Sequence, residues 1–146
     1  MTAVVQIPAL SERQQDLLRR WAYTRQASRR DEVSGEVMYQ ASLHVLEQGL
    51  CWWQGTERCL VMATEEPGPY LALHFVADRG GLQDVLAIVE RFIREDWPQL
   101  GCPEIRATNN NRALRRVIRS LGARLAGADV EFREPTPGSF VWRTTC

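Results

Sequence analysis

The residues best suited to binding a ligand are Arg79, Gly80 and Gly81, which separate an apolar segment from an amphipathic one. Glycine has no side chain to block an approaching oxyanion, and the first amide hydrogens of a helix have no partner inside the helix. A helix beginning at Leu82 would also direct its positive end at a bound phosphate. The glycine pair directly before a helix start predicts an anion-binding site. The same glycine pair suits a tight strand-to-helix turn without a ligand, and both interpretations stay open.

Candidate proton acceptors lie just before that turn. His74 is in the middle of the apolar run 70–76, and imidazole titrates close to neutral pH, as a general base must. Glu65 and Glu66 end the preceding apolar segment, where a carboxylate could take a proton from an amine through water. The structural alternatives are a hydrogen-bonded strand histidine and carboxylates of a solvated turn before Pro67.

The four cysteines are scattered along the chain without a C-x-x-C spacing, at Cys51, Cys59, Cys102 and Cys146. This pattern predicts neither a metal site nor a disulfide framework, and it favours a reducing, cytoplasmic environment. Cys102 could accept an acyl group, but no basic neighbour in the sequence activates its thiol. A structural role for Cys102 is favoured.

A basic helix face is predicted near the C-terminal end, formed by Arg112, Arg115, Arg116 and Arg119. It could contact the phosphates of a cofactor or an acidic protein surface, whereas most charge runs are solvated faces. No Asp or Glu occurs between Glu104 and Asp129, which favours a docking surface.

Hydrophobic periodicity predicts the elements that position these residues. The clearest signal is a helix from Leu82 with apolar residues at i, i+3, i+4, i+7, i+10 and i+11, which ends near Pro98. Helices are also predicted after Ser11, over 37–48 with Val37, Ala41 and Val45 on one face, and over 111–122. A charged link is predicted at 25–34. Strands are predicted at 2–7, 51–53, 59–63, 70–76, 104–108, 130–133 and 139–142.

The predicted order is β-α-α-β-β-β-α-β-α-β-β, in a single domain over residues 1–146. Two strand–turn–helix units in succession imply one parallel pair of strands, and the remaining connections imply antiparallel pairs. We therefore expect an α/β (α+β) fold with a mixed sheet of about seven strands and helices on both faces.

Composition narrows the classes of partner. The 18 basic and 18 acidic residues cancel, which disfavours nucleic acid and membrane surfaces as partners. No apolar run is long enough for a membrane span, and the first residues lack the features of a signal peptide. The composition is compatible with an oligomer as well as a monomer.

The predicted order resembles the GNAT acyltransferase superfamily, small N-acetyltransferases that use acetyl-CoA. The segment from Asn111 to Gly122 is similar to the fourth-helix signature of that family. The resemblance implies direct acetyl transfer to a small-molecule or peptide amine, with Glu65, Glu66 or His74 as the base. It also implies that backbone groups near 75–77 stabilise an oxyanion. The implied acetyl-CoA contacts are Phe75, Val76, Arg79, Gly80, Gly81, Leu82 and Asn111.

The chain departs from the GNAT pattern at several positions. Leu82 and Asp84 stand where the phosphate loop of the family has small residues, and Ile118 stands where many members carry a tyrosine that protonates the leaving thiolate. These departures favour an alternative: a non-catalytic binding or structural protein that uses the arginine face for docking. Compact chains of this kind resemble those encoded by phages, which would make the protein virion-associated or a host-factor binder.

Overall fold

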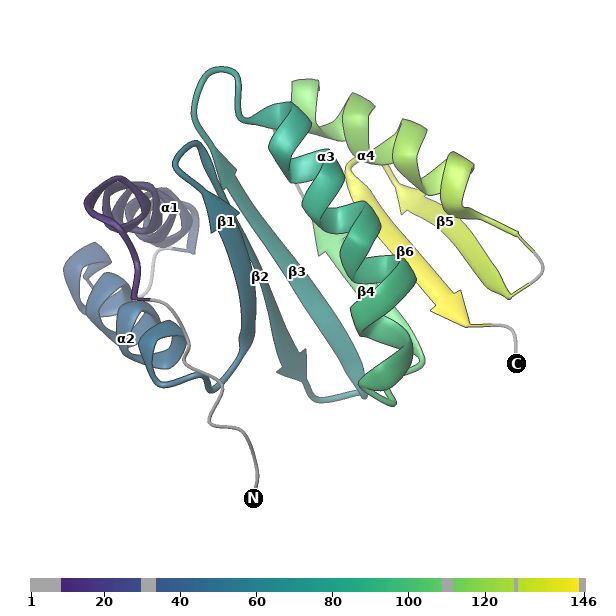
Figure 1. Cartoon of the computed structure of the whole chain (residues 1–146), viewed down its shortest axis with the longest axis horizontal. Helices are drawn as coiled ribbons and strands as arrows, with labels where there is room; N and C mark the ends of the chain where they lie inside the picture. Colours follow the sequence, from purple (N-terminus) through teal and green to yellow (C-terminus); the bar gives the residue numbers. More distant parts are fainter. Residues whose placement is uncertain (1–8, 30–33, 109–111, 128, 145–146) are drawn as a thin grey trace.

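The computed structural model describes residues 9–29, 34–108, 112–127 and 129–144 (Figure 1). In this part of the chain, the helices are α1 (Glu12–Arg29), α2 (Gly35–Glu47), α3 (Leu82–Arg91) and α4 (Arg112–Leu125). The strands are β1 (Trp52–Thr56), β2 (Cys59–Glu66), β3 (Tyr70–Ala77), β4 (Glu104–Thr108), β5 (Val130–Thr136) and β6 (Ser139–Thr144). A π-helical turn (Phe92–Asp96) and a 3₁₀ turn (Trp97–Gln99) extend α3.

The strands form one sheet in the order β1-β2-β3-β4-β6-β5. β3 and β4 are parallel, and the other described pairs are antiparallel. The predicted mixed sheet is confirmed, with six strands in the described residues. The strand predicted at 2–7 lies outside these residues.

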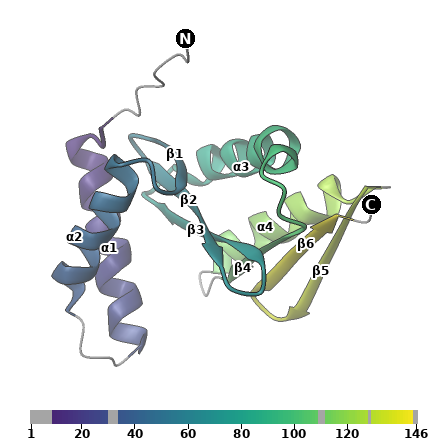
Figure 2. The ribbon, with the colours of Figure 1, turned by 90° about the horizontal axis from the view of Figure 1, so that it is seen from below.

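Helices cover the two faces of the sheet, as predicted. The larger core lies between the sheet and helices α3 and α4, and it includes Leu73 and Phe75 from β3. The smaller core lies under α1 and α2 and receives Val76. Side chains alternate along a strand, so His74 faces the α1–α2 side. In Figure 2 the α1–α2 pair stands beside β1 to β3, while α3 and α4 lie across the other face.

The first helix is longer than predicted. Ser11 caps α1 as expected: its hydroxyl accepts a bond from the Gln14 amide at 3.2 Å, and the Gln14 side chain accepts one from the Ser11 amide at 3.0 Å. The helix then continues to Arg29, so the predicted link at 25–34 is wrong in its first half. No glycine or proline interrupts this segment, and arginine, glutamine and alanine favour helix.

Two other helix predictions need correction. α2 turns Val37 outward, with 59% of its surface exposed, and it buries Tyr39 and Leu46 instead. α4 runs past Gly122 to Leu125, so this glycine does not end the helix. The glycine instead lets α4 pack closely on the Phe132 ring, because a Cβ at Gly122 would lie 2.3 Å from Cε1 of that ring.

Candidate functional site

The parallel strands β3 and β4 are paired over only three positions. The last is Leu73 opposite Ala107, whereas β3 continues to Ala77. Residues 74–77 remain bonded to β2 on their other side. Within the described residues, nothing pairs with this part of β3 along its β4 edge. His74 is therefore the first residue of β3 beyond the paired segment.

The turn after β3 is built around its two glycines. The Asp78 amide donates to the Arg58 carbonyl at 2.7 Å, and the Gly81 amide donates to the Asp78 carbonyl at 2.8 Å. Gly80 has φ +85°, a conformation that favours glycine. A Cβ at Gly81 would lie 2.4 Å from the Arg58 carbonyl oxygen. The glycines thus let the β1–β2 hairpin approach the start of α3.

Charged side chains from the β1–β2 hairpin and from α3 lie near this turn. The Asp84 carboxylate, in the first turn of α3, accepts a bond from the Thr56 hydroxyl at 2.8 Å. A Cβ at Gly80 would lie 3.2 Å from Nη1 of Arg58. A second guanidinium besides Arg79 therefore lies close to the glycine pair. Arg58 could not be identified from sequence alone, since only the fold brings the hairpin to this turn.

His74 and Glu66 are brought together by a third residue, Thr64. The Thr64 hydroxyl lies 3.2 Å from His74 Nε2 and donates to the Glu66 carboxylate at 3.3 Å. When the Thr64 hydrogen points to Glu66, the Thr64 oxygen accepts the Nε2 hydrogen of His74. The edge of the Trp21 ring packs on the imidazole, with ring centroids 5.4 Å apart. Sequence reasoning missed Thr64, although its spacing of two from Glu66 already placed both on one face of a strand.

This Glu66–Thr64–His74 relay lines a cavity of about 260 Å³ between the sheet and α2. α1 contributes Trp21, α2 contributes Ser42 and Leu46, and the rest of the wall is mostly apolar. Such a cavity has room for a small organic group.

The sheet beside the relay carries a tightly held ion network. The Glu104 carboxylate is 6% exposed and accepts bonds from Arg106 at 2.6 Å and from Arg143 at 2.5 Å. Hydrogen bonding to Arg143, followed by that to Arg106, lowers the pKa of Glu104. Arg106 also lies over the Tyr70 ring at 4.0 Å, on the face of the sheet that carries His74.

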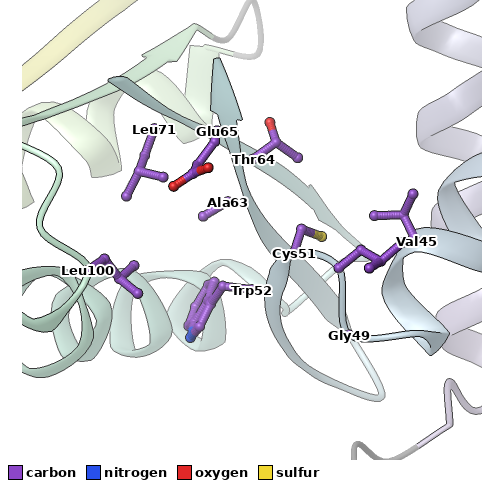
Figure 3. Close-up of a pocket in the computed structure, with 10 residues that line it drawn as sticks. Val45, Gly49, Cys51, Trp52, Ala63, Thr64, Glu65, Leu71 and Leu100 are labelled. Carbon is purple, nitrogen blue, oxygen red and sulfur yellow. The ribbon is translucent and has the colours of Figure 1, made fainter. Parts of the chain in front are cut away.

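The structure separates Glu65 from the other candidate bases. Because side chains alternate along β2, Glu65 lies on the opposite face from Thr64 and Glu66. Figure 3 shows its carboxylate on the same side of β2 as Trp52, Leu71 and Leu100, while Thr64 points away. Glu65 lines a different hollow, of about 650 Å³.

The remaining predicted residues have different environments. Phe75 is buried in the larger core, Val76 packs under α1 and α2, and Leu82 is partly buried at the start of α3. Asn111 lies outside the described residues.

The arginine face of α4 is partly neutralised. Arg119 donates two bonds to Glu134, at 2.6 and 2.7 Å, and this pairing, with the Gly138 amide, lowers the pKa of Glu134 to about 2. Arg112 and Arg116 are exposed.

The cysteines offer no reactive centre in the described part of the chain. Burial raises the pKa of the Cys51 and Cys59 thiols, which disfavours the nucleophilic thiolate. The Cys102 thiol donates to the carbonyl of Glu104. No cluster of metal-ligating side chains occurs among the described residues. Nor is any described helix long and apolar enough to cross a bilayer.

Comparisons with known proteins give no match: no family model fits the chain, and neither the curated proteins nor the solved structures include one that is significantly similar.

Proposed function

We propose that this protein is an acetyl-CoA-dependent N-acetyltransferase of the GNAT type, which acts on a small-molecule or peptide amine by direct transfer. The observation that carries the proposal is the position of His74. It is the first residue of β3 beyond the pairing with β4, and Thr64 links it to the Glu66 carboxylate at the wall of a cavity. A base is thus held where two parallel strands cease to pair and an extended thioester could reach the sheet.

The residues around the turn are suited to holding the cofactor. Amide hydrogens at the start of α3 and the guanidinium groups of Arg58 and Arg79 would face its diphosphate. The backbone of residues 75–77 would hold the pantetheine arm and polarise the carbonyl. When bound, the cofactor supplies an activated acyl group.

The base in this proposal is His74. The neutral imidazole accepts the amine proton, and the positive charge that forms is stabilised through Thr64 by Glu66. Glu66 therefore acts through Thr64 and not on the amine directly. Glu65 has no part in this step because it lies on the other face of β2.

The first test is thermal melting with and without saturating acetyl-CoA. A ligand at 100 times its Kd stabilises a fold by about 2.7 kcal/mol, which is a measurable shift in Tm. The second test follows CoA thiol release in the presence of a panel of primary amines. His74→Gln should lower kcat at least about a hundredfold without loss of acetyl-CoA binding. His44→Gln is the matched control, because His44 is exposed on α2. No shift of Tm with acetyl-CoA would rule the enzyme out.

A second candidate function is that of a non-catalytic binding protein. Two observations favour it: the glycine turn is fully explained by contact with Arg58, and Ile118 is buried, so α4 presents no proton donor at that position. In this case the exposed Arg112 and Arg116 would contact an acidic protein surface. Reversing both charges to glutamate should abolish binding to polyglutamate in fluorescence anisotropy. The matched control is Arg94→Glu in the π-helical turn, outside α4, and equal binding by both variants would exclude the docking face.

A further inference from the structure

The hollow beside Glu65 has a simple structural origin. β1 begins at Trp52, opposite Ala63, whereas β2 continues to Glu66. The last residues of β2 therefore have no β1 partner, and this leaves a notch at the edge of the sheet. The segment between α2 and β1 and the side chain of Leu100 enclose this notch to give a hollow of about 650 Å³ (Figure 3).

The wall of the hollow is largely apolar. Trp52, Ala63 and Leu71 line it from the sheet, and Leu50 and Leu100 stand at its border. Leu50 is 69% exposed and Leu100 is 45% exposed, although both are large apolar side chains. Two such exposed leucines beside one concavity are typical of a surface that receives an apolar ligand.

One charged side chain lines the hollow, and it is Glu65. Its carboxylate has no hydrogen-bond or ion-pair partner among the residues that the structure describes. Glu66 and Glu104, in contrast, accept bonds from neighbouring side chains. A single carboxylate beside low-dielectric walls produces a negative potential that no described group neutralises.

The shape, the apolar wall and the single negative charge together determine the class of ligand. We infer that this hollow binds a small organic cation, an ammonium group attached to an apolar or aromatic body. The ammonium pairs with Glu65, and the body packs on Leu71 and Leu100. The indole of Trp52 adds an aromatic surface: one part packs on Phe92 with ring centroids 4.4 Å apart, and the rest faces the hollow. At about 30 Å³ per water molecule, the hollow has room for about twenty waters, enough for an arylalkyl amine.

This hollow adjoins the cavity of the relay, since Val45, Cys51 and Thr64 line both, but its charged side chain lies on the other face of β2. Glu65 points away from Thr64 and the relay, so the cation would bind on the other side of β2 from His74. The inference is therefore tested by binding alone, without any measurement of turnover.

The test compares three probes of nearly equal size: phenethylammonium, phenethyl alcohol and hydrocinnamate, which are cationic, neutral and anionic. Isothermal titration at low ionic strength should give binding of the cation at millimolar concentration or tighter. Binding of the alcohol should be at least tenfold weaker, and hydrocinnamate should not bind. Glu65→Gln should weaken binding of the cation at least tenfold and leave binding of the alcohol unchanged. Leu100→Ala should weaken binding of both the cation and the alcohol.

The matched control is Glu57→Gln, which removes an exposed carboxylate at the other end of the β1–β2 hairpin and should leave binding unchanged. Three results would overturn the inference. The first is no binding of the cation up to about 10 mM, which is weaker than a specific site provides. The second is equal affinity for the cation and the alcohol. The third is a dimer in sedimentation velocity that Leu100→Arg dissociates, since a second copy of the chain would then occupy the hollow.

Discussion

Gly122→Ala is the substitution for which the packing gives the sharpest expectation. A methyl group at this position of α4 would lie 2.3, 2.4 and 2.5 Å from three ring atoms of Phe132. The ring is partly buried; it stacks on Phe140 with centroids 6.1 Å apart and tilts against Trp142 at 5.1 Å, so these two rings block its movement on their side. Both of these neighbours are fully buried.

Two opposing effects set the magnitude. An extra methyl in a packed core costs about 1–3 kcal/mol. Alanine in a helix interior is more favourable than glycine by about 1 kcal/mol. Because three ring atoms lie far inside contact distance, we expect a cost near the upper end, and a net loss of about 1–2 kcal/mol in the free energy of unfolding.

Urea denaturation followed by tryptophan fluorescence measures this loss, and a double-mutant cycle tests its cause. In a Phe132→Val background the ring atoms are gone, so Gly122→Ala should raise the free energy of unfolding by about 1 kcal/mol through helix propensity alone. Ser120→Ala, at an exposed position of the same helix, is the matched control and should have a small effect in both backgrounds. A stabilising effect of Gly122→Ala in the wild-type background, or an equal effect in the two backgrounds, would refute the packing argument.

Two further predictions follow from the electrostatics and from the turn before α3. Pairing with Arg119 lowers the pKa of Glu134 to about 2, so the stabilisation from this pair is present above the ordinary glutamate value and is lost as pH falls toward 2. In urea titrations of the Arg119→Gln variant, the free energy of unfolding should therefore fall less between about pH 4.5 and 2 than in the wild type. In the control Arg116→Gln, the free energy of unfolding should fall with pH as steeply as in the wild type. Gly81→Ala places a methyl 2.4 Å from the backbone oxygen of Arg58, and it should lower stability by more than about 1 kcal/mol. An unchanged Tm for this variant would mean that the hairpin does not lie against the turn.

Where the hydrophobic pattern was strong, the sequence predicted the elements well. The apolar stripe of α3 is buried through Val85 and Val89 and continues to Phe92 in the π-helical turn, and the alternation of β3 places Leu73 and Phe75 in one core. These elements are recognisable because each has one buried face with a regular period.

The errors arose where local residues do not determine the outcome. Val37 shares a helical face with Ala41 and Val45, yet α2 turns Val37 outward because Tyr39 and Leu46 fill the space above the sheet. For Gly122, sequence alone cannot distinguish a glycine that ends a helix from one that admits a distant ring.

The candidate site depends on strand register and on contacts between residues far apart in the chain. Local sequence patterns do not reveal either of them. Thr64 meets His74 because the turn between β2 and β3 pairs Met62 with His74, which sets Thr64 diagonally across from the imidazole. A register shift of one residue would have placed Glu65 on the side of His74 instead. The approach of Arg58 to Gly80 likewise required the whole hairpin to be in place.

The most direct test of the account is an NMR titration of the labelled protein with acetyl-CoA. If β3 beyond Leu73 and the turn before α3 form the acyl-CoA site, the largest amide shifts will fall on residues 75–77 and 79–82. In His74→Gln the same amides should shift, although turnover is lost. Amide signals that do not change at saturating acetyl-CoA, or changes confined to the α4 arginines, would contradict the account.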